Sequence, residues 1–221
     1  MNITFTHVAS PFRTSQYLAK QIAAKLQEGR RVLWLISGGS SIAIAAATAS
    51  RLAGRDLSRL TVSLIDERYG EPGHPESNWF QFEQTGAKLP GATLHPILTG
   101  ADQVTTAEVF AEFLETALAT SDYRLGLLGI GPDGHTSGIL PHSPAVTASG
   151  LVCAYDGPDY KRITTTQAAL SRLDEAVVYA AGEAKWPVLD RLETSLPVAE
   201  QPAQILKSIP KLTIFTDRPP A

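Results

Sequence analysis

The sequence predicts an α/β protein in which helices cover both faces of a mostly parallel sheet. Short β-rich segments alternate with helical ones along the chain, which is typical of such folds. Several β segments are apolar throughout, as in RVLWLI at 31–36, and an unbroken apolar run is expected of a strand buried on both faces. We therefore expect a three-layer α/β/α architecture of Rossmann-like type, formed as one domain over residues 1–221.

The strands and the first helix follow from local patterns. Ser10 and Pro11 are typical of a helix N-cap and first turn, and Gly29 is expected to end that helix. Strands are expected at residues 3–8, 31–36, 60–65, 123–128, 151–155, 176–181 and 212–215.

Three further helices are expected between these strands. One spans residues 42–52, and Ser77 is expected to cap a short helix over 78–84. Thr105 with Glu108 forms a capping-box pattern, which predicts that a longer helix begins there.

Composition excludes several classes of function. The 19 Lys and Arg residues against 22 Asp and Glu give a net charge of −3, whereas a general nucleic-acid binder needs an excess of cations. The single cysteine, Cys153, excludes an intrachain disulfide and a cysteine-rich metal site. The first thirty residues lack an apolar stretch long enough for a signal peptide, and no apolar run is long enough for a membrane span. We expect a cytoplasmic protein without membrane or nucleic-acid partners, and a monomer is compatible with the sequence.

The first loop of interest is SGGSS at residues 37–41, directly after the RVLWLI strand. Glycine allows close backbone approach, and free N–H groups at a helix start suit an anion such as phosphate. Ser37, Gly38, Gly39 and Ser40 are therefore candidate anion-binding residues. A plain tight strand-to-helix turn explains the same residues. The sequence has no Gly-Lys-Ser/Thr segment, which excludes a Walker phosphate loop.

The second loop begins with Asp66-Glu67-Arg68-Tyr69, immediately after an apolar strand. The strand period of two would direct Asp66 and Arg68 to the same side, over a crevice at the strand ends. A solvated charged loop is the alternative interpretation.

The third loop is GIGPDGHT at residues 129–136. It matches the dinucleotide pattern G-x-G-x-x-G, but Gly138 and Pro141 interrupt the helix that such a site requires, so we exclude NAD binding. Asp133 lies two residues before His135, and a carboxylate can orient an imidazole as a general base. A loop histidine without a role is the alternative. No histidine, cysteine and carboxylate cluster has metal-ligand spacing, so no metal is expected.

Together these loops resemble the glucosamine-6-phosphate isomerase/6-phosphogluconolactonase family. The resemblance rests on SGGSS at 37–41, DERYGEPGHPESN at 66–78, GIGPDGHTSGILP at 129–141, Arg162-Ile163-Thr164 and the segment 182–185, which occur in the family's order over nearly the whole chain. It implies a NagB/RpiA/CoA transferase-like fold and an enzyme of sugar-phosphate metabolism that needs no cofactor.

Two positions separate the branches of this family. The deaminase branch carries tyrosine where this chain has Arg68, and a glutamate where it has Leu140. The resemblance therefore implies a lactonase, which hydrolyses 6-phospho-D-glucono-1,5-lactone in the pentose phosphate pathway without a metal or a covalent intermediate. The alternatives are a glucosamine-6-phosphate deaminase/isomerase and a non-catalytic sugar-phosphate sensor.

The resemblance also implies roles for single residues. His135 is the expected general base and Asp133 its orienting partner, while Asp66 shapes the site. Arg68, Arg162 and Lys185 are expected to hold the phosphate or the carboxylate of the ligand. Either arginine could instead form a surface ion pair with Glu67 or Asp159. Lys185, at a predicted helix start, is unfavourably placed unless an anion lies nearby.

Overall fold

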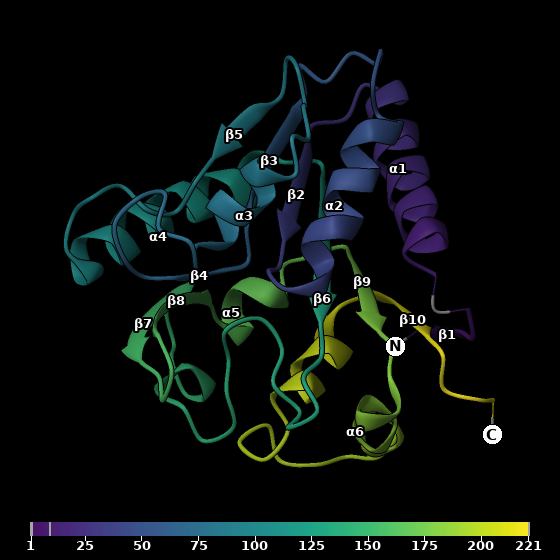
Figure 1. Ribbon diagram of the computed structural model, residues 1–221, viewed down its shortest axis with the longest axis vertical. Helices are drawn as coiled ribbons and strands as arrows, with labels where there is room; N and C mark the ends of the chain where they lie inside the picture. Colours follow the sequence, from purple (N-terminus) through teal and green to yellow (C-terminus); the bar gives the residue numbers. More distant parts are fainter. Residues whose placement is uncertain (1, 9, 221) are drawn as a thin grey trace.

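The computed structural model describes residues 2–8 and 10–220, and its centre is a seven-stranded sheet (Figure 1). The strand order is β1-β10-β9-β6-β2-β3-β5, and every neighbouring pair is parallel. The strands are β1 (Asn2–Thr6), β2 (Val32–Ile36), β3 (Leu60–Leu64), β5 (Thr93–His95), β6 (Tyr123–Gly129), β9 (Glu175–Ala180) and β10 (Lys211–Thr216). The predicted parallel sheet is confirmed.

Helices flank this sheet, as the sequence predicted. They are α1 (Pro11–Gln27), α2 (Ser40–Arg51), α3 (Asn78–Gln84), α4 (Gln103–Thr120), α5 (Gln167–Leu170) and α6 (Trp186–Leu192), with 3-10 turns η1 (Pro144–Val146), η2 (Glu183–Lys185) and η3 (Pro202–Ser208). Helix α1 packs against α2, and α2 against α3. Right-handed connections between parallel strands place these three helices on one face of the sheet and α4 on the other. All five residues of β2 are buried, as its unbroken apolar sequence requires.

A second, three-stranded antiparallel sheet covers the carboxyl ends of the central strands (Figure 1). It consists of β4 (Asp66–Arg68), β8 (Lys161–Thr165) and β7 (Val152–Asp156), in that order. The strand predicted at 151–155 therefore belongs to this sheet and not to the parallel one. Ile65 joins the two sheets, because its N–H donates to Ile36 O and its carbonyl accepts from Thr165 N, both at 2.9 Å.

The four predicted helices form, but α2 begins at Ser40, two residues before the predicted range, and the predicted start of α4 is wrong. Ser10 caps α1 and Ser77 caps α3, each through its hydroxyl oxygen. The capping box at Thr105 is wrong, because α4 begins at Gln103 and its N-cap is Asp102. The Asp102 carboxylate accepts from the N–H groups of Val104 and Thr105, each at 3.0 Å. A carboxylate three residues upstream thus supplies the cap that we assigned to a threonine.

In the described ranges, no helix combines the length and the apolar character needed to cross a membrane.

Candidate active site

One crevice of about 340 Å³ lies at the carboxyl ends of β2, β3, β6 and β9. Loops that are far apart in sequence meet there because the carboxyl ends of parallel strands share one edge of the sheet. The predicted site residues that line it are Ser37, Gly38, Gly39, Ser40, Asp66, Arg68, His135, Arg162 and Lys185. Asp133 does not line the crevice, but its carboxylate is hydrogen-bonded to Nδ1 of His135.

The SGGSS loop leads from β2 into α2, which begins at Ser40 with Gly39 as its N-cap. The first N–H groups of a helix have no acceptor within the helix, so this end of α2 offers donors to the crevice. Gly38 is required here because a Cβ atom would lie 1.9 Å from Oδ1 of Asn78. The SGGSS loop and the start of α3 are therefore in direct contact, and this contact requires glycine at position 38.

His135 and Asp133 form a hydrogen-bonded pair at the rim of the crevice. The distance from His135 Nδ1 to Asp133 Oδ1 is 2.6 Å, and the same oxygen accepts the His135 backbone N–H at 3.1 Å. Because the carboxylate accepts at Nδ1, the other ring nitrogen, Nε2, keeps its lone pair. Gly131 makes the arrangement possible, since a Cβ atom there would lie 2.2 Å from the imidazole ring.

Two arginines face each other across the second sheet. Arg68 of β4 is directly paired with Arg162 of β8 in the antiparallel register. The Tyr160 ring centroid lies 5.3 Å from one guanidinium and 5.8 Å from the other. Like charges directly opposite each other destabilise a strand pair. The Asp159 carboxylate, which also lines the crevice, offsets part of this repulsion, and a bound anion offsets more.

The sequence left open that either arginine forms a surface ion pair with Glu67 or Asp159, and the hydrogen bonds of the two arginines bear on this alternative. Arg162 is 8% exposed and donates to both carboxylate oxygens of Asp159 at 2.7 and 2.8 Å. Arg68 donates from Nη1 to Glu76 O at 2.9 Å. The Nε atoms of both arginines are buried and have no hydrogen-bond partner in the described part of the chain. The ion pair with Asp159 thus forms, and it leaves the Nε donor of Arg162 without a partner in the described residues.

Lys185 closes the crevice from the turn after β9. Burial lowers the pKa of Lys185, while the charge of Asp217 opposes that shift. The Asp217 carboxylate also accepts hydrogen bonds from the backbone N–H of Gly182 to Oδ2 and from Trp186 Nε1 to Oδ1, both at 2.9 Å. These bonds fix the turn that carries the lysine.

The two acidic residues of β4 have different surroundings. Burial raises the pKa of Asp66, against the lowering effect of the Arg68, Arg162 and His135 charges. Burial also raises the pKa of Glu67, whose carboxylate accepts from the N–H groups of Asn78 and Trp79 and from the Ser77 hydroxyl. Glu67 therefore anchors the start of α3, and Asp66 is left beside the cations.

Several functional candidates were missed by reasoning from the sequence alone. Asn78, Ser137 and Asp159 also line the crevice. Asn78 donates from Nδ2 to Asp66 O at 2.9 Å. The sequence feature that could have identified Asn78 is its position directly after Ser77, the predicted helix cap. Among the described residues, these crevice atoms are buried without a partner: Ser37 Oγ, Arg68 Nε, Asn78 Oδ1, Ser137 Oγ and Arg162 Nε. Buried polar atoms normally have partners, so this concentration indicates a polar ligand.

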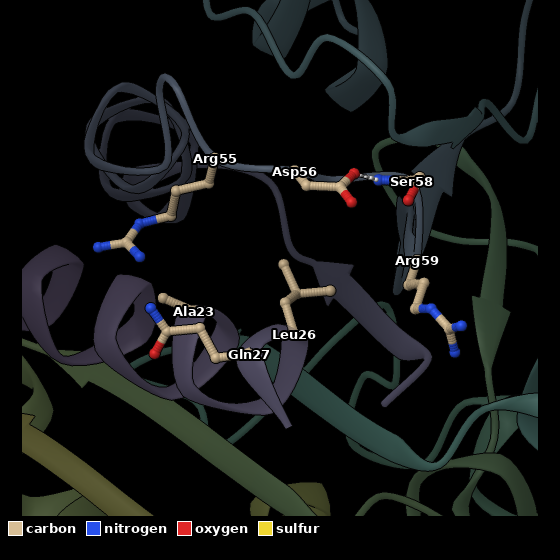
Figure 2. Close-up of a pocket in the computed structure, with 7 residues that line it drawn as sticks. All are labelled: Ala23, Leu26, Gln27, Arg55, Asp56, Ser58 and Arg59. Atoms are coloured by element: carbon tan, nitrogen blue, oxygen red, sulfur yellow. Dashed lines mark hydrogen bonds between the residues drawn. The ribbon is translucent and has the colours of Figure 1, made fainter. Parts of the chain in front are cut away.

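Metal-ligating side chains are not grouped in the described residues: no three of His, Cys, Asp or Glu lie close enough to hold an ion. A second pocket of about 270 Å³ lies at the opposite end of the sheet, between the end of α1 and the segment that precedes β3 (Figure 2). Polar groups that line it bond within the protein, as in the bond from Ser58 N to Asp56 Oδ1 at 2.9 Å. None of the predicted site residues lines it.

Fold and site define an α/β protein in which a histidine–aspartate pair and two arginines meet at the carboxyl ends of the parallel strands. Residues 9–214 match the family model described as glucosamine-6-phosphate isomerases/6-phosphogluconolactonase. The chain belongs to this family.

Individual relatives agree with the family match. The rat 6-phosphogluconolactonase is 30% identical over 205 residues, which cover 82% of this chain and 79% of that protein. The Mycobacterium tuberculosis 6-phosphogluconolactonase is 29% identical over 179 residues, with 74% and 72% covered.

Solved structures share the fold. A 6-phosphogluconolactonase from Shewanella baltica has a TM-score of 0.84 at 22% identity, with 97% of each chain covered. The Trypanosoma brucei 6-phosphogluconolactonase has a TM-score of 0.77 at 21% identity, with 97% of this chain and 95% of that chain covered. The predicted fold class is confirmed.

Proposed function

We propose that this protein hydrolyses 6-phospho-D-glucono-1,5-lactone to 6-phospho-D-gluconate, a reaction of the pentose phosphate pathway. The observation that carries the proposal is the pair of His135 and Asp133 at the rim of a crevice that Arg68 and Arg162 also line. A general base and an anion-binding wall are what hydrolysis of a phosphorylated ester requires. Curated relatives that bear the lactonase name support the same reaction.

The phosphate of the substrate binds at the cationic wall. Arg68 and Arg162 have unpartnered Nε donors within the described structure, and guanidinium groups suit phosphate oxygens. Lys185 and the amides at the start of α2 approach the same crevice from two other strands. Binding of a dianion also reduces the repulsion between the paired arginines.

Hydrolysis then proceeds at the lactone carbonyl. His135 Nε2 accepts a proton from a water molecule as the water oxygen bonds to the carbonyl carbon, and the carbonyl oxygen becomes an oxyanion. Asp133, hydrogen-bonded to Nδ1, stabilises the imidazolium that forms. Collapse of the tetrahedral intermediate breaks the bond to the ring oxygen, which takes the proton from His135 and leaves as a hydroxyl. The product acid ionises, so one proton is released for each lactone opened.

The deaminase alternative lacks support in the crevice. Leu140, at the position where the sequence resemblance places the deaminase glutamate, does not line the crevice and carries no titratable group. We further propose a cytoplasmic enzyme that acts on a free small molecule and needs neither nucleic acid nor a membrane.

The test is the release of acid from freshly generated lactone above the spontaneous background, for the unaltered protein, His135→Asn and His142→Asn. His142 lies outside the crevice, and asparagine tolerates its left-handed backbone (φ 57°). Loss of a general base predicts a fall in kcat of about 10²–10⁴-fold for His135→Asn and no more than about twofold for His142→Asn. No acceleration by the unaltered protein, or equal losses in both variants, would overturn the proposal.

A further inference from the structure

Ser137 has a backbone conformation that serine rarely adopts. Its φ of 55° lies in the left-handed region, which among the described non-glycine residues only His142 shares. Such a conformation is unfavourable for a side chain with a Cβ atom, so it persists only where the surroundings impose it.

Both neighbours of Ser137 are fixed by buried hydrogen bonds. The Thr136 hydroxyl donates to Gly129 O at 2.9 Å. Gly138 N donates to Thr164 Oγ1 at 3.0 Å, and Gly138 O accepts from the Tyr155 hydroxyl at 2.6 Å. These contacts hold the backbone on either side and determine where the Ser137 side chain lies.

The Ser137 side chain lies at the crevice, next to the proposed base. Ser137 is 9% exposed and lines the crevice together with His135. Thr136 between them is fully buried and bonds to Gly129 O. Ser137 therefore lies two residues from the proposed base, and Gly138 after it bonds to Thr164 and Tyr155 of the second sheet.

The hydroxyl of Ser137 forms no hydrogen bond with the described part of the protein. Its Oγ is buried and bonds to nothing within residues 2–8 and 10–220. An unpartnered buried hydroxyl is unfavourable, and glycine would adopt the same backbone without strain. A serine at this position is explained if its hydroxyl bonds to a ligand in the crevice.

We propose that the Ser137 hydroxyl donates a hydrogen bond to the carbonyl oxygen of the lactone and to the oxyanion that forms from it. This inference rests on the proposed lactonase function. The base must lie within one water molecule of the carbonyl carbon. Ser137 lines the same crevice two residues from His135, which brings it near that carbonyl group. The hydroxyl keeps its proton throughout and forms no covalent bond.

The test compares Ser137→Ala and Ser137→Gly with the unaltered protein in lactone hydrolysis. Loss of one oxyanion donor predicts a fall in kcat of about 10²-fold in both variants, with KM changed by less than about threefold. Ser137→Gly should also raise the Tm, because glycine relieves the left-handed strain. A more stable variant that is still slow separates the chemical role of the hydroxyl from a structural one.

Thr165→Val is the matched control, since Thr165 Oγ1 is also buried without a partner in the described chain but does not line the crevice. It should keep kcat within about twofold. If Ser137→Ala hydrolyses lactone as fast as the unaltered protein, the inference is wrong and the lactonase function stands. A raised KM with unchanged kcat would also overturn it, by assigning Ser137 to a substrate hydroxyl. An unaltered protein without activity would refute the lactonase function itself.

Discussion

The two ends of the parallel sheet each bury charged groups, but they partner them differently. At the amino end Glu175, the first residue of β9, is 1% exposed. Its carboxylate accepts from the hydroxyls of Tyr17 and Tyr123 and from the Lys211 ammonium. At the carboxyl end, buried donors of Arg68 and Arg162 have no partner in the described part of the molecule.

Pocket size does not distinguish the two ends. The crevice of about 340 Å³ and the pocket of about 270 Å³ in Figure 2 are similar in volume, and each is lined by two arginines. In the second pocket Arg59 donates to Gly29 O at 2.8 Å. The comparison indicates that the amino end serves stability, whereas the carboxyl end keeps its buried donors for a ligand.

Glu175→Gln should give the largest change in stability. The amide cannot accept all three hydrogen bonds and places donors against hydroxyls and an ammonium group. We expect the free energy of unfolding to fall by about 2–3 kcal/mol, which corresponds to a decrease in Tm of about 5–10 °C. Thermal unfolding measures this, and kcat and KM at 25 °C should stay within about twofold.

Tyr17→Phe is the milder companion variant, since it removes one donor to Glu175 and should lower stability by about 1 kcal/mol. A loss of activity in Glu175→Gln without a loss of Tm would contradict the assignment of this end to stability.

Arg162→Ala should change binding more than stability. Removal of one charged hydrogen-bond donor from the ligand is worth about 2 kcal/mol, or about 30-fold in KM. Asp159, left without its partner, is half-exposed and remains solvated. Steady-state kinetics measure KM, and calorimetry with 6-phosphogluconate measures binding without turnover.

Arg59→Ala is the matched control, because Arg59 lines the pocket at the other end. Its KM should remain within about twofold of the unaltered protein. Equal increases in KM for the two arginine variants would show that they act through net charge and not through position.

The sequence was sufficient to predict six of the seven strands of the central sheet, all but β5, and most of the crevice. Runs such as VLWLI in β2 are buried over all five residues, and the SGGSS, DER and GPDGH loops follow neighbouring strands. The carboxyl ends of parallel strands meet at one edge, so these loops had to converge. Local chemistry was also sufficient for the caps Ser10 and Ser77.

Contacts between distant segments could not be predicted in this way. The second sheet depends on the pairing of residues 66–68 with 162–164, nearly a hundred positions apart. The contact of Gly38 with Asn78 and the left-handed backbone of Ser137 likewise follow from tertiary packing. The roles of the site residues stay predictions that the variants proposed above can test.

Asp66→Asn should give the smallest effect, with a sign opposite to that of Glu175→Gln. Burial raises the pKa of Asp66 above the ordinary 3.8, although the Arg68, Arg162 and His135 charges oppose the shift. As the pH rises through 3.8 the unfolded chain loses its proton first, so the folded state loses stability until its own pKa is passed. Asparagine has no such loss. We expect Asp66→Asn to raise the Tm by about 2–4 °C at pH 7, on the order of 1 kcal/mol.

The pH dependence makes this prediction specific to the carboxyl group. Below the ordinary pKa of 3.8 the aspartate is neutral in both states, so the difference in Tm between the two proteins should shrink toward zero as the pH falls to that value. Thermal unfolding between pH 4 and pH 8 measures it. A gain of the same size at every pH would assign the effect to packing of the amide. A lower Tm for Asp66→Asn at pH 7 would show that the nearby cationic side chains compensate the Asp66 charge as fully as the partners of Glu175 compensate that carboxylate. The contrast between the two ends of the sheet would then hold for the arginines but not for the carboxylates.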